Sequence, residues 1–147
     1  MKIAVAGLGT VGAGTVKVLQ DNADLLSSRS GRSIQVTAVS ARDKSRDRGV
    51  PLDGYAFFED AVEMAAKADA DVVVELIGGE NGVAKDVVEA AIKSGKHVVT
   101  ANKALVAHHG TALANAAEQA GVTLNYEAAV AGGIPVIKSL REGLAGN

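Results

Sequence analysis

Apolar residues along the chain form two kinds of pattern, and the two alternate from the amino-terminal end onward. Short runs rich in β-branched residues predict strands, and stretches with apolar residues at helical spacing predict helices between them. The expected strands cover residues 2–6, 34–40, 55–58, 71–77, 97–101 and 122–126. The expected helices start at residue 11, cover 59–68, 83–94 and 108–120, and end with a stretch that starts at Pro135. Residues 27–33 and 41–49 are polar and are expected to form loops.

This alternation predicts an α/β fold with a mainly parallel sheet. Connections of this kind are right-handed βαβ units, and their helices cover both faces of the sheet. The composition agrees, because 48% of the residues are hydrophobic but only 3% are aromatic, and Trp is absent. The core is therefore expected to consist of Val, Ile, Leu and Ala, which suits a buried parallel sheet. A length of 147 residues suits a single domain.

Three glycines follow the first expected strand directly, and the first helix begins among them. Gly7, Gly9 and Gly12 have the spacing G-x-G-x-x-G. In this strand–turn–helix context the first glycine allows a tight turn, the second lets a pyrophosphate approach the backbone, and the third lets helix and strand pack closely. The alternative is an ordinary glycine-rich turn. We expect a Rossmann-type, doubly wound domain that binds a dinucleotide at the start of the first helix.

Charge and cysteine content exclude several other functions. The net charge of −2 gives no general electrostatic reason to bind nucleic acid or a membrane surface. The sequence has no Cys, which excludes disulfides, zinc–thiolate sites and thiol catalysis. The first apolar segment is short and interrupted by glycines, so it does not resemble a signal peptide, and no apolar run reaches the length of a membrane span. The cytoplasm is the expected location.

The residues after the second strand bear on which phosphate the cofactor carries. An acidic residue at this strand end binds the ribose 2′-hydroxyl of NAD, whereas an Arg accommodates the 2′-phosphate of NADP. Here Arg42 and Lys44 follow the strand, and Asp43 between them keeps NAD possible. The charges of the loop alternate in sign, which indicates that Arg46 and Arg48 belong to a solvated loop. We expect Arg42 to contact a 2′-phosphate, the alternative being a solvated side chain there as well.

The ends of two later strands supply further candidate cofactor contacts. Gly78 ends one strand and would let the backbone approach the nicotinamide ribose, or is simply a loop glycine. Thr100 and Lys103 follow the next strand, and Lys103 would hydrogen-bond a substrate oxygen or the cofactor ribose there. The alternative for Lys103 is a solvated lysine at a helix start. Glu75 lies inside an apolar strand, and we expect it to be structural, bound to backbone amides or a Lys.

The last strand ends near a carboxylate and a glycine-rich bend. Backbone carbonyls of the bend, together with Glu127, would offer oxygen ligands to a cation. His97, His108 and His109 do not have metal-ligand spacing, because adjacent residues of a helix point in different directions. We expect the histidines to be solvated or structural.

Four segments together resemble the homoserine dehydrogenase family. They are GLGTVGAG near the start, VELIGG in the middle, TANKALVA, and YEAAVAGGIPVIKSLREGLAGN at the end. The likeness covers essentially the whole chain, which resembles the amino-terminal nucleotide-binding domain of a bacterial-type enzyme. It implies the reversible, NAD(P)-dependent interconversion of homoserine and aspartate semialdehyde, on the route to threonine, methionine and isoleucine. The alternative is a stand-alone NAD(P)-sensing module without catalysis.

The resemblance also implies roles for individual residues. It makes Arg42 part of the 2′-phosphate region, and it makes Thr100 and Lys103 cofactor contacts, with Lys103 also touching substrate and taking part in proton transfer. The residues that would form the pyrophosphate loop are Gly7, Leu8, Gly9, Thr10, Val11 and Gly12. The residues that would form a sodium site, mostly through backbone carbonyls, are Glu127, Val130, Gly132 and Ile134.

The resemblance further implies that the substrate-binding and catalytic domain follows the point where this sequence stops. Residues 1–147 are then the NAD(P)-binding domain, and most of the surface for homo-oligomer formation lies in the other part. An amphipathic helix ending at Gly146 and Asn147, with little chain left to cover its apolar stripe, agrees with this expectation. We expect the chain alone to bind cofactor, with little or no turnover of homoserine.

Overall fold

Six strands form a single sheet in the computed structural model, which describes residues 1–144. The strands are β1 (Lys2–Ala6), β2 (Gln35–Ser40), β3 (Ala56–Phe58), β4 (Val72–Glu75), β5 (His97–Thr100) and β6 (Leu124–Asn125). Their order across the sheet is β3-β2-β1-β4-β5-β6, and every pairing between neighbours is parallel. The chain therefore leaves β1 in one direction and returns to its other side at β4. This confirms the doubly wound α/β fold predicted from the sequence.

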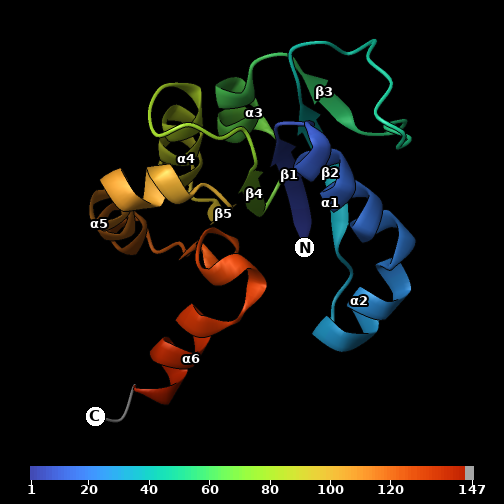
Figure 1. Cartoon of the computed structure of the whole chain (residues 1–147). Coiled ribbons are helices and arrows are strands. Elements are labelled where there is room, and N and C mark those ends of the chain that lie inside the picture. Colours follow the sequence, from blue (N-terminus) through green and yellow to red (C-terminus); the bar gives the residue numbers. More distant parts are fainter. Residues whose placement is uncertain (145–147) are drawn as a thin grey trace.

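Helices connect most of these strands and lie along the sheet (Figure 1). They are α1 (Thr10–Asp21), α2 (Ala23–Ser30), α3 (Ala61–Lys67), α4 (Val83–Lys93), α5 (Lys103–Gln119) and α6 (Val136–Gly143), with two short 3₁₀ turns at Glu127–Ala129 and Ala131–Gly133. A long irregular segment, instead of a helix, joins β2 to β3. Within the described residues, none of the helices is both long and apolar enough to cross a membrane.

Two hydrophobic clusters, one on each face, hold helices against the sheet. Successive residues of a strand point to opposite faces, so Val73 and Val74 of β4 belong to different clusters. Val74 packs with Val16 of α1, whereas Val73 packs with residues of α3, α4 and α5, among them the fully buried Met64 and Leu105. Helices thus cover both faces, as predicted, and the carboxyl ends of the strands remain at one edge.

Three elements differ from the sequence-based prediction. The expected loop at 27–33 lies partly in α2, which ends where Gly31 adopts a left-handed φ of 68°. The helix expected from 108 begins five residues earlier, because the Asn102 side chain accepts a hydrogen bond from the Leu105 amide and caps α5 at Lys103. The strand expected over 122–126 has only two paired residues in β6.

The last helix begins beside Pro135, as predicted, and leads away from the sheet (Figure 1). The apolar residues that the sequence places on its stripe include Ile134, Leu140 and Leu144, and each of these is more than half exposed. The predicted end of this helix at Gly146 and Asn147 lies outside the described residues.

Candidate functional site

The point where the strand order reverses, between β1 and β4, is where ligands bind in sheets of this kind. The glycine loop (residues 7–12) leaves the carboxyl end of β1 here. The Gly7 amide donates to the Ser40 carbonyl at the end of β2 (3.0 Å), and the Leu76 amide donates to the Ala6 carbonyl (2.8 Å). The ends of three neighbouring strands are therefore joined by backbone hydrogen bonds around the start of the glycine loop.

Two glycines of the loop are required by the fold itself. Gly7 has a φ of +94°, and a Cβ atom built on it would lie 2.9 Å from the backbone of Leu76. A Cβ atom on Gly12 would lie 1.8 Å from the carbonyl oxygen of Gly7, because the first turn of α1 packs directly on the loop. A side chain at Gly7 would push the glycine loop away from Leu76, and one at Gly12 would push α1 away from the glycine loop.

The remaining glycine of the motif is not required by the fold. Gly9 has a φ of −72°, which any residue adopts, and a Cβ atom there would meet nothing within 4 Å. Gly9 precedes α1, whose first turn has neither an acidic residue nor a side-chain cap. The first amides of a helix have no intrahelical partner, so they are available to an anion at this open position.

The basic loop (residues 41–49) runs past the end of β2. Arg42 is exposed at its start, and the Lys44 ammonium lies over the Phe57 ring of β3, 5.7 Å from its centroid. The Asp43 carboxylate is turned back into its own loop, where it accepts from the Ser45 amide (2.8 Å) and hydroxyl (2.7 Å). These hydrogen bonds lower the pKa of Asp43. The acidic residue that would favour NAD is thus engaged within the loop, whereas Arg42 is free to meet a ligand.

Arg48 corrects the expectation that it belongs to a solvated loop. Its side chain is half-buried, and its Nε donates to the carbonyl of Leu8 in the glycine loop (3.3 Å). Its two terminal nitrogens donate to the carbonyls of Arg46 and Asp43. Arg46 itself is exposed, as predicted. Nothing in the alternating charges indicates that one of these arginines reaches across to the glycine loop.

A buried hydrogen-bond network joins the ends of β4 and β5. The fully buried Glu75 accepts from the amides of Ile77 (2.7 Å) and Gly78 (3.1 Å), and the Thr100 hydroxyl donates to its other oxygen (2.5 Å). This confirms the prediction that backbone amides bind Glu75. The network directs the Thr100 side chain to Glu75, so any cofactor contact of Thr100 is left to its backbone.

Asn102 extends this network to the start of α5. The Asn102 amide donates to the Thr100 hydroxyl (3.0 Å), and the Asn102 side chain donates to the Gly79 carbonyl (2.6 Å). Sequence reasoning missed Asn102, although an Asn before a helical apolar pattern is a capping signal. Lys103 comes next, exposed, as the first residue of α5. A cation is unfavourable at a helix amino terminus, so stability does not explain a lysine at this place.

The structure gives the sodium-site prediction no positive support. The Glu127 carboxylate accepts from the amides of Ile137 (3.1 Å) and Lys138 (3.1 Å), at the start of α6. The Ile134 carbonyl accepts from the Val136 amide (2.7 Å). Within residues 1–144, no three His, Cys, Asp or Glu side chains lie close enough together to hold a metal ion. Val130 and Gly132 lie in the same bend, and the part of all four residues in a cation site stays a prediction.

The histidines have structural partners. His108 lies 3.0 Å from a carboxylate oxygen of Glu80, and His109 lies 2.9 Å from the side-chain oxygen of Asn81. Both pairs tie α5 to the loop that follows β4. His97, at the other end of the sheet, accepts from the Thr123 amide (3.0 Å). These positions agree with the prediction that the histidines are solvated or structural.

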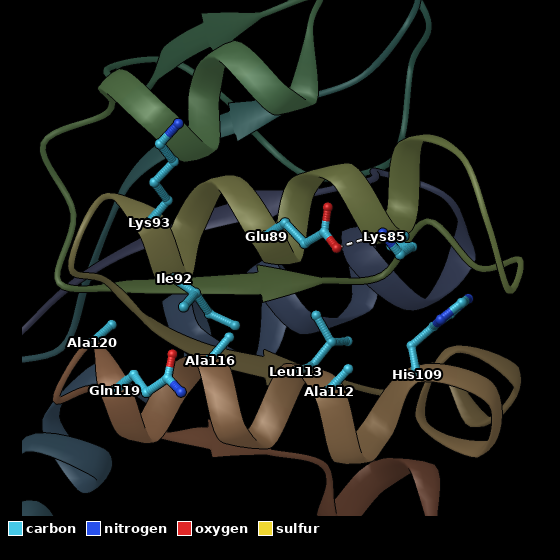
Figure 2. Close-up of a pocket in the computed structure, with 10 residues that line it drawn as sticks. All are labelled: Lys85, Glu89, Ile92, Lys93, His109, Ala112, Leu113, Ala116, Gln119 and Ala120. Carbon is cyan, nitrogen blue, oxygen red and sulfur yellow. Dashed lines mark hydrogen bonds and ion pairs between the residues drawn. The ribbon is translucent and has the colours of Figure 1, made fainter.

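An apolar groove of about 510 Å³ lies between α4 and α5 (Figure 2). Ile92 of α4 faces Leu113 and Ala116 of α5, where the small alanine side chains leave space between the helices. None of its lining residues comes from the glycine loop, the basic loop or the ends of the strands. The groove is thus separate from the candidate site.

Comparisons with known proteins agree with this geometry. A sequence profile described as "Homoserine dehydrogenase, NAD binding domain" matches residues 7–127. Homoserine dehydrogenase of Neisseria gonorrhoeae is 49% identical over 147 residues, and that of Pseudomonas aeruginosa is 47% identical over 150 residues. Both alignments cover 100% of this chain and 33% of the relative. The crystal structure of a homoserine dehydrogenase from Thiobacillus denitrificans superimposes with a TM-score of 0.88 and 44% identity, over 100% of this chain and 34% of the other. The chain thus spans about a third of the length of these relatives.

Proposed function

Because the chain belongs to the family of homoserine dehydrogenase NAD-binding domains, we propose that it holds a nicotinamide dinucleotide across the carboxyl ends of β1 and β4. The observation that carries this proposal is the contrast among the three glycines. The fold requires glycine at Gly7 and Gly12. Neither the backbone angles nor the surroundings of Gly9 require a glycine there. A glycine at this place is explained by a pyrophosphate that approaches the backbone beside the first amides of α1. Leu8, Thr10 and Val11 are the neighbours of Gly9 in this part of the loop.

We propose that the cofactor is NADP(H) in preference to NAD(H). Arg42 is exposed at the end of β2, where its guanidinium would bind the 2′-phosphate, and Lys44 adds positive charge beside it. Two hydrogen bonds from Ser45, both to Oδ1, hold the Asp43 carboxylate against its own loop. Both features favour a phosphate over a free hydroxyl.

We infer that Lys103 is the residue of this chain that acts on the substrate. The nicotinamide supplies the hydride chemistry when the cofactor is bound. As the hydride leaves the carbon of homoserine that carries the hydroxyl, that hydroxyl loses its proton, and the Lys103 ammonium would stabilise the developing negative charge or relay the proton. The network of Glu75, Thr100 and Asn102 fixes the turn that carries Lys103, which supports a positioning role for it. Gly78, anchored to Glu75, would face the nicotinamide ribose.

The reaction itself is proposed for the whole protein, because the chain spans about a third of its relatives. We propose that homoserine and aspartate semialdehyde are its substrates, and that a further domain supplies the other substrate contacts and the homo-oligomer surface. The chain alone would then bind cofactor with little or no turnover. A sodium ion at Glu127 has no support from the contacts of this carboxylate, which accepts from two amides of α6, and no step is derived through it.

Calorimetric titration of the chain with NADPH and with NADH tests this proposal. We expect both to bind, NADPH more tightly, and Arg42→Ala to abolish the difference without abolishing NADH binding. If the chain binds neither nucleotide, the proposed site is wrong. If Arg42→Ala leaves the preference for NADPH unchanged, the assignment of the 2′-phosphate contact is wrong. Efficient oxidation of homoserine by the chain alone would contradict the requirement for a further domain.

A further inference from the structure

Among residues 1–144, Arg48 is the one side chain that joins by hydrogen bonds the two loops flanking the proposed adenosine end of the cofactor. Its Nε donates to the Leu8 carbonyl in the glycine loop, and its terminal nitrogens donate to the Arg46 and Asp43 carbonyls in the basic loop. The planar guanidinium has five N–H groups in a fixed arrangement, so three divergent hydrogen bonds from one group determine the relative placement of both loops.

The glycine loop does not depend on Arg48 for its own position. Gly7 is hydrogen-bonded to Ser40, and the loop packs against Leu76 and the first turn of α1. The basic loop has fewer constraints, since most of its side chains are exposed and no helix or strand includes residues 41–49. Arg48 therefore fastens a loosely held segment to a firmly held one.

We propose that Arg48 is a positioning residue for cofactor selectivity, which holds the basic loop so that Arg42 is preorganised to bind the 2′-phosphate of NADP(H). This inference rests on the proposed function. All three hydrogen bonds of Arg48 end on neutral carbonyl oxygens, so its charge is not neutralised by them and adds to the positive field beside the phosphate. The placement of Arg42, and not this added charge, is the main contribution.

The two contributions are separable by substitution. Arg48→Ala removes the hydrogen bonds and one charge. Arg48→Lys keeps the charge but cannot reach three carbonyls, because an ammonium on a single flexible stem is a point donor. Arg46→Ala is the matched control: it removes one charge from the same loop but keeps the backbone carbonyl that Arg48 binds. Arg42→Ala, alone and combined with Arg48→Ala, shows whether Arg48 acts through Arg42.

The experiment measures the dissociation constants of NADPH and NADH for the chain and these variants, with circular dichroism to verify folding. We expect Arg48→Ala and Arg48→Lys each to lower the preference for NADPH about tenfold, which corresponds to ~1.4 kcal/mol. NADH binding should change little, and Arg46→Ala should lower the preference by less than about twofold, as expected of a distant exposed charge. In the Arg42→Ala background, Arg48→Ala should have no further effect on the preference.

Several results would overturn the inference. If the wild type prefers NADPH but Arg48→Ala behaves as Arg46→Ala does, Arg48 has no positioning role, and the proposed function stands. If Arg48→Lys restores the preference, or if the effect of Arg48→Ala persists without Arg42, charge alone explains the result. If Arg48→Ala does not fold, Arg48→Lys decides between these outcomes. A wild type that binds both nucleotides equally, or neither, overturns the inference at its base, and in the last case the proposed function also fails.

Discussion

Substituting Gly12 by Ala perturbs the contact on which the β1–α1 connection depends. The new Cβ atom would lie 1.8 Å from the Gly7 carbonyl oxygen and 2.9 Å from its carbonyl carbon, whereas real Cβ atoms stay at least 3.0 Å from such neighbours. The start of α1 and the glycine loop must therefore separate by more than an ångström. Both are backbone segments, so no flexible side chain is available to absorb the change.

The size of the effect follows from two opposing contributions. Overpacking of this kind costs about 1–3 kcal/mol. Replacing Gly by Ala inside a helix returns about 0.5–1 kcal/mol. We expect a net loss of roughly 1–2 kcal/mol in the free energy of unfolding, and Tm lower by about 2–8 °C. NADPH affinity should fall more than tenfold, because the amides of α1 move away from the pyrophosphate.

Urea unfolding and NADPH titration of the same preparations measure both effects. Gly14→Ala is the matched control, because Gly14 lies in the same helix and a Cβ atom there would meet nothing within 4 Å. It should gain about 0.5–1 kcal/mol of stability and bind NADPH as the wild type does. If Gly12→Ala proves as stable and binds as tightly as Gly14→Ala, the close approach of α1 to the glycine loop is not what the sequence motif encodes.

Three further predictions concern carboxylates that accept hydrogen bonds from neighbouring groups. Glu75→Gln turns an amide donor toward the Thr100 hydroxyl and should cost about 1–3 kcal/mol in urea unfolding; unchanged stability would show that the network is dispensable. Glu127→Ala removes the carboxylate at the start of α6 and should cost ~1 kcal/mol of local stability, seen as faster amide hydrogen exchange confined to α6. The hydrogen bonds from Ser45 lower the pKa of Asp43 in the folded chain. The ionised Asp43 carboxylate therefore stabilises the fold above the ordinary carboxyl pKa of 3.8, and this stabilisation disappears as the pH falls through the lower pKa of the folded chain. Asp43→Ala should therefore differ from the wild type in stability near pH 5, and this difference should shrink as the pH falls below 3.8. A difference that does not shrink at low pH would contradict this assignment.

Local chemistry explains why the fold and the glycine loop could be predicted from the sequence. Each strand is a short apolar run between polar segments, and the G-x-G-x-x-G spacing encodes its own turn and helix start. The packing of Gly12 against Gly7 is local in the same sense, since five residues separate them. The buried Glu75 was also predictable in outline, because a carboxylate in an apolar strand needs nearby donors.

Long-range contacts explain what the sequence did not predict. Arg48 reaches Leu8 across forty residues, and nothing in a run of alternating charges distinguishes it from its exposed neighbour Arg46. The start of α5 at Lys103 depends on Asn102, whose side chain caps the helix and also holds the Gly79 carbonyl. The two-residue length of β6 reflects its place at the edge of the sheet, where it pairs with β5 alone.

The proposed function depends on a dinucleotide pyrophosphate that approaches the backbone at Gly9. The most direct test is to titrate wild type and Gly9→Ala with NADPH in parallel and to compare their urea unfolding. We predict that Gly9→Ala changes the free energy of unfolding by less than about 1 kcal/mol, because a Cβ atom there meets nothing within 4 Å. The same substitution should weaken NADPH binding more than tenfold, because the Cβ atom would occupy the place of the pyrophosphate. If Gly9→Ala binds NADPH as tightly as the wild type, the pyrophosphate does not lie there, and the proposed site is wrong.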